Sequence, residues 1–239
     1  MAVSRVMSRW SSARLSDRPP RSTQAAHPPK ACGDRRGVLA SAAANPAEDA
    51  LEVEILQRIW CSLAAAASRR SPFTLMQFAT VDENNAPKLR TIVVRGFDER
   101  TGRIAFSTNV GSRKVAELST NRLVALVAFD GDAGVQLRIE GCAEIVADPA
   151  ERKQAWDALR PHTHLLFRSS APGTPLSSIR DGQTLFGGEN SQILDPFEQF
   201  ALVRVTLKHL DWLDISSEPH RRCHFVREDE EWRGEWIPP

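Results

Sequence analysis

The sequence predicts a mainly β protein, a β-barrel or sandwich with added helices, and three observations lead to that fold class. Apolar and β-branched segments of strand length follow one another along most of the chain, with turn residues between them. Strands do not alternate with helices as they do in a doubly wound parallel sheet. No Gly-x-Gly-x-x-Gly motif follows a strand, which argues further against a dinucleotide-binding fold. We expect six or seven strands, mainly antiparallel.

The first predicted element is an amphipathic helix from about Ala47 to Ala67. Its apolar residues recur every four positions, at Leu51, Ile55, Ile59 and Leu63. Pro72 ends it, because the residue before a proline is driven out of the helical conformation. Apolar segments separated by Asp, Asn and Gly turns then predict three strands, at 73–81, 88–96 and 103–108.

A short helix from Ser112 to about Thr120 leads into the second half of the sheet. The continuous apolar run 123–129 is typical of a buried strand. Residues 135–147 alternate between apolar and polar at their start, as a half-exposed strand does.

Asp148 and Pro149 suit the cap and first turn of a further helix, which runs to about Leu159. Residues 161–197 are rich in Pro and Gly and are expected to form a long loop with little regular structure. A loop of that length inside a compact domain is usually functional or mobile. The remaining strands are predicted at 200–207, 210–215, 222–227 and 232–237, the last two as a hairpin.

The basic character of the chain is concentrated in residues 1–45. The 239-residue chain has a net charge of only +1 at pH 7, so no overall field points to nucleic acid or to an anionic membrane. Residues 1–45 contain eight Lys or Arg against two acids and lack hydrophobic periodicity, which predicts a disordered leader before one domain at 46–239. Such a leader resembles a mitochondrial or plastid transit peptide; the alternative is a tail or an over-extended start of a cytoplasmic protein.

Other composition features narrow the class of protein. No apolar run reaches the roughly 18 residues that a membrane-spanning helix needs. Four cysteines are scattered without a Cys-x-x-Cys pair, which favours a reducing compartment over a disulfide framework. The histidines near 162–164 and 220–224 do not complete a four-ligand set at convincing spacing, so we expect no metal.

Two segments combine strong cations with β-branched residues. Residues 90–95 are Arg-Thr-Ile-Val-Val-Arg, and residues 106–114 are Phe-Ser-Thr-Asn-Val-Gly-Ser-Arg-Lys, just before a predicted helix. A helix N-terminus presents unpaired N–H groups and a partial positive charge, so hydroxyl and cationic side chains there suit a phosphate. Gln136, Arg138 and Arg222 extend the polar set, although each alone also fits a solvent-facing strand residue. The residues by themselves indicate a β-rich domain with an anion site.

These two runs, followed by Gln-Leu-Arg-Ile-Glu-Gly at 136–141, resemble in order and spacing the flavin-binding core of the pyridoxamine 5'-phosphate oxidase family. The C-terminal part is similar as well, because Trp212 is followed ten residues on by Arg222, with His220 between them. The resemblance covers residues 50–145 well and 198–239 moderately. It implies a split β-barrel homodimer with one FMN in each of two clefts between subunits, and an oxidoreductase that acts on a small molecule.

The resemblance also implies roles for particular residues. The FMN phosphate region would be bound by Arg90, Arg113 and Lys114, with Ser112 supporting the turn. The ribityl or phosphate end would contact Ser107 and Thr108. The isoalloxazine ring would be lined by backbone groups of Thr91, Ile92, Val93 and Val94, with Arg95 beside it and Gln136 at its edge. The other subunit would contribute Trp212 and Arg222.

Two positions depart from the family's pattern. Arg95 replaces a lysine that serves both flavin and substrate, and Glu218 replaces a substrate-binding arginine six residues after the tryptophan. A carboxylate there would repel a substrate phosphate. His220 matches a family position near the substrate, so Arg95 and His220 are the implied substrate-binding residues, and no catalytic residue is assigned.

We therefore expect a divergent FMN-dependent oxidoreductase with altered substrate-binding positions. One alternative is a non-catalytic split barrel that binds flavin or haem. The other is a true pyridoxamine 5'-phosphate oxidase whose phosphate site is rearranged within the loop 161–197.

Overall fold

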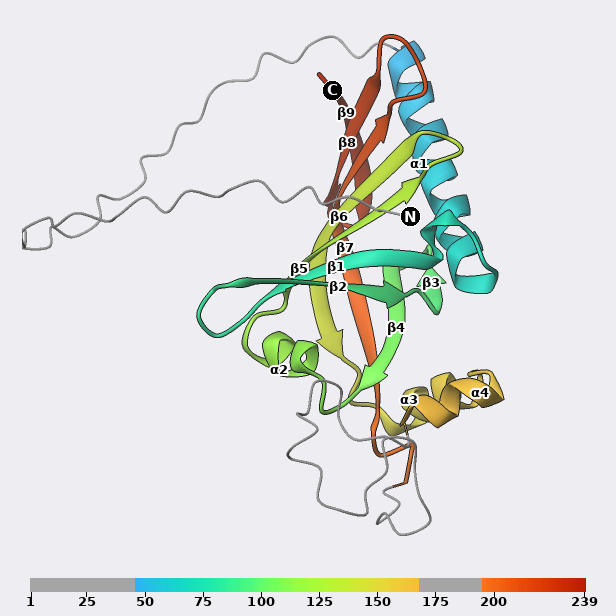
Figure 1. Ribbon diagram of the computed structural model, residues 1–239. Coiled ribbons are helices and arrows are strands. Elements are labelled where there is room, and N and C mark those ends of the chain that lie inside the picture. The colour runs from blue at the N-terminus through green and yellow to red at the C-terminus, as the bar shows by residue number, and fades with distance from the viewer. Residues whose placement is uncertain (1–45, 168–194) are drawn as a thin grey trace, which may run out of the picture. The chain divides into compact units, whose positions relative to one another are not determined.

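The computed structural model describes residues 46–167 and 195–239, and within them nine strands form one antiparallel sheet with helices at its edges (Figure 1). The strands are β1 (Leu75–Val81), β2 (Pro87–Val93), β3 (Gly96–Asp98), β4 (Arg103–Asn109), β5 (Leu123–Asp130), β6 (Val135–Ile145), β7 (Phe200–Asp214), β8 (Arg221–Glu228) and β9 (Glu231–Ile237). The helices are α1 (Pro46–Ser68), α2 (Arg113–Thr120), α3 (Pro149–Asp157) and α4 (Pro161–His164), with short 3₁₀ turns η1 (Pro72–Thr74) and η2 (Leu165–Phe167). The predicted mainly β fold class is confirmed.

The strands of the sheet follow the order β2-β1-β5-β6-β7-β4-β3, and β8 and β9 extend it from β7. The two ends of this order, β2 and β3, lie close together, so the sheet closes on itself. β2 continues almost directly into β3 on the opposite edge, where the Arg95 N–H donates to the Ala105 carbonyl at 2.8 Å. β2 and β4 are therefore in contact, as the walls of a barrel are.

A bulge between β6 and β7 explains the glycine that ends the Gln136–Gly141 motif. The pairing register shifts between Glu140 and Gly141. A Cβ on Gly141 would lie 2.4 Å from the Thr206 carbonyl oxygen, so no larger residue fits there without moving the backbone of β7.

The differences from the predicted elements have simple causes. The described residues contain nine strands, more than the six or seven expected, and the three-residue β3 lies in a segment predicted as the end of one strand and a turn. The predicted strands 200–207 and 210–215 form one strand, β7. The predicted loop 161–197 begins with α4 and η2, and its residues 168–194 lie outside the described part, as does the predicted leader 1–45.

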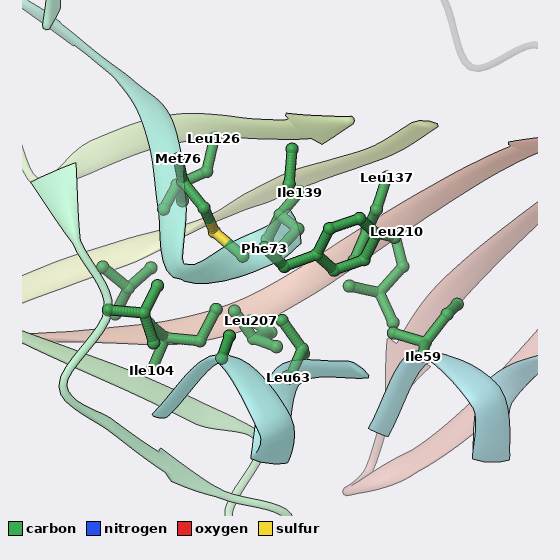
Figure 2. Packing of buried hydrophobic residues seen from close by; sticks show 14 of the residues in the cluster. Ile59, Leu63, Phe73, Met76, Ile104, Leu126, Leu137, Ile139, Leu207 and Leu210 are labelled. Carbon is green, nitrogen blue, oxygen red and sulfur yellow. The ribbon is translucent and has the colours of Figure 1, made fainter. Parts of the chain in front are cut away.

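The barrel interior is filled by side chains from almost every element (Figure 2). Ile59 and Leu63 of α1 belong to the same cluster as Leu137 and Leu210 of the sheet, and none of the four is more than 2% exposed. Burial of each such side chain contributes about 1.5–3 kcal/mol, which fixes the sheet as a rigid frame for its polar residues. A second cluster, built on Phe200, lies beside α3.

No helix in the described ranges is both long and apolar enough to cross a membrane.

Candidate functional site

The run 106–114 ends one strand and begins one helix, as the sequence predicts. Ser112 has extended backbone angles and occupies the N-cap of α2, three residues after the end of β4. Its hydroxyl does not cap the helix and instead lies 3.2 Å from the Thr108 hydroxyl. Lys114 reaches back so that its ammonium group donates to Thr108 Oγ1 at 2.9 Å. The turn thus gathers two hydroxyls and a cation at the start of α2.

Arg90 joins this group from β2 through a buried carboxylate. Its guanidinium donates to Glu117 Oε2 at 2.6 Å and to Thr80 Oγ1, and the Thr80 hydroxyl donates in turn to Glu117 at 2.5 Å. The side chains of Glu117 and Arg90 are 8% and 22% exposed, and Thr80 is buried. Charged groups persist in such surroundings only when they are paired and hydrogen-bonded. We call this set the α2 cluster: Thr80, Arg90, Thr108, Ser112, Lys114 and Glu117.

The electrostatics of the α2 cluster are those of a site prepared for an anion. Burial lowers the pKa of Lys114, the Arg90 guanidinium lowers it further, and the Glu117 carboxylate opposes both effects. Thr108 uses only one of the three donors of the Lys114 ammonium group. Arg113 is exposed and makes no ion pair within the described residues. The hydrogen-bond donors that remain free at this site, within the described residues, belong to Lys114 and Arg113, two cations beside a helix N-terminus. Such a set fits a phosphate dianion.

The alternation of β4 separates the two predicted ligands Ser107 and Thr108. Thr108 faces the α2 cluster, whereas Ser107 lines a cavity of about 1100 Å³ between the end of α1, β3, β4 and α3. We call it the arginine cavity, because four arginines line it: Arg69, Arg70, Arg95 and Arg160. All four are exposed, and none makes an ion pair in the described part of the chain.

The carboxylate that lines the arginine cavity is held in an ion pair. Glu151 of α3 is paired with Arg204, whose guanidinium also bonds Glu144 at 3.1 Å. The described lining therefore carries several uncompensated positive charges and suits an anionic ligand. A volume near 1000 Å³ is enough for a drug-sized molecule.

The remaining predicted residues of the β2 segment lie along the wall of the barrel. Ile92 is 4% exposed, so only its backbone can face a ligand, as the resemblance implies. Thr91 is exposed and its hydroxyl donates to Gln77 at 3.3 Å, and Val93 is partly buried.

A third group lies across β6, β7 and β8. Gln136 pairs with Leu213, and Leu213 pairs with Arg222, so their side chains share one face of the sheet. Arg222 is bound by both oxygens of Asp211, at 2.9 and 2.7 Å, and this hydrogen bonding to Arg222 lowers the pKa of Asp211.

Two other predicted residues of the C-terminal part, Trp212 and His220, lie outside this group. Trp212 is 5% exposed and packs in the core of its own chain, with Arg221 over its ring at 5.8 Å. His220 is exposed in the turn between β7 and β8, as is Glu218. Within one chain, neither His220 nor the Gln136–Arg222 row belongs to the α2 cluster, and their roles stay predictions.

Sequence reasoning missed several residues of these sites. Glu117 is a helix residue three positions after Lys114, and that spacing puts both on one helix face. Arg69 and Arg70 form a cationic pair at the end of a helix, and Arg160 precedes a proline. Only the fold brings these arginines, from 69 to 160, around one cavity. No metal site emerges from the described residues, where no three His, Cys, Asp or Glu side chains group suitably.

Comparison with known proteins identifies the family. The family model described as the FMN-binding domain of pyridoxamine 5'-phosphate oxidase matches residues 57–147. A pyridoxine/pyridoxamine 5'-phosphate oxidase of Nostoc punctiforme is 37% identical over 182 residues, which cover 74% of this chain and 82% of that protein. The chain belongs to the pyridoxamine 5'-phosphate oxidase family. Pyridoxine/pyridoxamine 5'-phosphate oxidase 2 of Arabidopsis thaliana is 28% identical over 159 residues, which cover 64% of this chain and 79% of that relative.

A solved structure agrees with the family assignment. A pyridoxamine 5'-phosphate oxidase-related, FMN-binding protein from Nostoc punctiforme matches with a TM-score of 0.61 at 25% identity, covering 82% of this chain and 99% of that one. The split-barrel fold and the FMN-binding, oxidoreductase character of the family are thereby shown. For three further bacterial oxidases of the family, the match spans only about half of each relative's length, 53%, 46% and 54%.

Proposed function

We propose that the protein is an FMN-dependent oxidoreductase that acts on a small anionic substrate as a homodimer. The observation that carries the proposal is the α2 cluster, where Arg90 and Lys114 converge with two hydroxyls at the start of a helix. A phosphate needs several cations and oriented N–H or O–H donors, and this cluster supplies them in a partly buried setting. FMN bound there would supply the redox chemistry, and the protein would supply binding and orientation.

The arginine cavity supports an anionic substrate. Arg95 and Ser107, both predicted at the flavin, line the same cavity as Arg69, Arg70 and Arg160. A substrate held by these guanidinium groups would lie next to the residues assigned to the flavin. The positive charge lost where Glu218 replaces an arginine would be supplied instead by arginines just after α1 and at the start of α4.

One apolar face of the sheet supports the homodimer. β1, β2 and β5 expose large side chains on a common face, and the cross-strand pairing puts Gln136 and Arg222 on it too. The exposed fractions of the large side chains are 54% for Leu75, 68% for Leu89, 70% for Leu123 and 52% for Phe129. An exposed apolar patch of this kind marks an interface, and a second copy seated there would meet the predicted flavin residues.

Purified protein tests the proposal. It should be yellow, retain FMN at one per chain and elute as a dimer, and Leu123→Lys with Phe129→Lys should yield monomers that lose flavin. The reaction class follows from anaerobic bleaching of the flavin. Bleaching by pyridoxamine 5'-phosphate supports a true oxidase of the family, and bleaching by NAD(P)H supports a reductase. A colourless preparation that does not take up FMN contradicts the proposal.

The alternative of a binding protein without turnover rests on Glu218 and makes a separate prediction. Flavin that binds tightly but is bleached by neither reductant favours it, and a Soret band favours haem over flavin.

We propose a cytoplasmic location, with a mitochondrion or plastid as the alternative if residues 1–45 are removed in cells. N-terminal sequencing of the protein isolated from cells distinguishes these.

A further inference from the structure

We propose that Glu117 is the built-in counter-anion of the phosphate site, a positioning residue that holds Arg90 in place and keeps Lys114 charged before the flavin arrives. The inference rests on the proposed FMN function and deepens it. It assigns a role to a buried carboxylate at the point where the predicted site gathers its cations.

The geometry gives Glu117 contact with one cation and proximity to the other. Its Oε2 accepts from the Arg90 guanidinium and from the Thr80 hydroxyl, and the side chain is only 8% exposed. Lys114 lies on the same helix three residues earlier, on the face that Glu117 occupies. Lys114 makes no ion pair among the described residues, and its ammonium group donates to the Thr108 hydroxyl.

A carboxylate beside a phosphate site needs a reason, because it repels the ligand. At an effective dielectric constant of about 20, unit charges separated by several ångströms interact by about 3–4 kcal/mol, so Glu117 weakens the attraction for the phosphate. The same charge offsets part of the repulsion between Arg90 and Lys114 in the flavin-free chain. Burial and Arg90 both lower the pKa of Lys114, and Glu117 is the group that raises it. The Glu117 carboxylate therefore weakens the attraction of the site for the phosphate, but it keeps Lys114 protonated.

Other charges near α2 are paired with other groups or exposed on the surface. α2 packs against β1, which carries no charged residue, and β6. On β6, Glu144 pairs with Arg204, Arg138 pairs with Asp211, and Glu140 projects on the sheet face that holds His209. On β2, Lys88 pairs with Asp82. Arg113, the third charged residue of α2, is exposed.

The test measures FMN affinity of the flavin-stripped protein from about pH 7.5 to about pH 9.5, where a phosphate with a second pKa near 6 stays dianionic. Affinity should fall as pH rises through the pKa of Lys114, because binding must then take up a proton. In Glu117→Gln this fall should begin about one pH unit lower. Riboflavin, which lacks the phosphate, should show no such difference between the two proteins.

Two further variants separate charge from structure. Lys114→Arg in the Glu117→Gln background should abolish the early fall, because an arginine does not lose its proton in this range. Glu117→Asp keeps the negative charge and should retain the wild-type profile. A merely structural role predicts instead that Asp and Gln variants behave alike, in thermal unfolding and in affinity. The inference is wrong if wild type and Glu117→Gln bind FMN with superimposable pH profiles, or if the early fall survives Lys114→Arg. Wild-type protein that binds no FMN at any pH refutes the proposed function, and the inference with it.

Discussion

The α2 cluster and the arginine cavity lie on opposite faces of β4, and they treat positive charge in opposite ways. In the cluster, Arg90 is tied to the buried Glu117, and Lys114 is held by Thr108. In the cavity, four arginines are exposed and make no ion pair within the described residues. A preorganised site loses little conformational entropy when its ligand binds, whereas flexible guanidinium groups must be ordered by theirs. The contrast suits the phosphate of a resident cofactor in the cluster and an exchanging anion in the cavity.

The largest expected effect is that of Arg90→Ala on folding. The change leaves Glu117 buried without its cation, and removal of one member of a buried pair costs about 3–5 kcal/mol. Urea unfolding at neutral pH measures the loss of stability. The double change Arg90→Ala with Glu117→Ala should recover much of it, because the orphaned carboxylate is gone. Single and double variants of equal stability would show that the pair is not coupled in the folded protein.

Arg113→Ala should act on binding and leave folding intact. Arg113 is exposed and its side chain has no ion pair in the described ranges, so the free energy of unfolding should change little. FMN affinity should fall by about 1.5–3 kcal/mol, the range for a charge-assisted hydrogen bond. Fluorescence titration with FMN measures the loss, and titration with riboflavin is the control that should not respond. Unaltered FMN affinity would remove Arg113 from the phosphate site.

The two sites were unequally accessible to prediction. The residues of the α2 cluster that come from the run 106–114 are consecutive in sequence, so a strand end, a turn and a helix start suffice to gather them. Glu117 escaped because its partner Arg90 is 27 residues away, and only the pairing of β1 with β2 places that arginine over α2. The arginine cavity was not predicted at all. The elements α1, β3 and α3 meet there only when the barrel closes, and no local sequence pattern encodes that closure.

Removal of cavity arginines should affect substrate rather than cofactor. Arg160→Ala or Arg69→Ala should raise the KM for an anionic substrate about tenfold while FMN affinity and stability stay unchanged, because both side chains are exposed and make no ion pair within the described residues. Steady-state kinetics, with the reductant that bleaches the flavin, measure the change. Arg100→Ala, an exposed arginine outside the cavity, is the matched control. An equal rise in KM for Arg100→Ala would point to a general field effect and not to the cavity.

The smallest effect concerns a carboxylate that, unlike Glu117, makes no ion pair within the described residues. Glu52 of α1 lies against the backbone of Gly234, and burial, followed by Asp49, Glu48 and Glu235, raises its pKa. A raised carboxyl pKa favours the folded state only while the group is protonated, so its ionised form opposes folding at neutral pH. Glu52→Gln should therefore add a few tenths of a kcal/mol at neutral pH, with the gain disappearing as the pH falls below about 4. Unfolding of both proteins at the two pH values measures it. Glu54 lies on the exposed side of the same helix and is paired with Arg58, so Glu54→Gln is the control and should give no gain in stability. A gain in both variants would mean that the net charge on α1, and not the burial of Glu52, sets the effect.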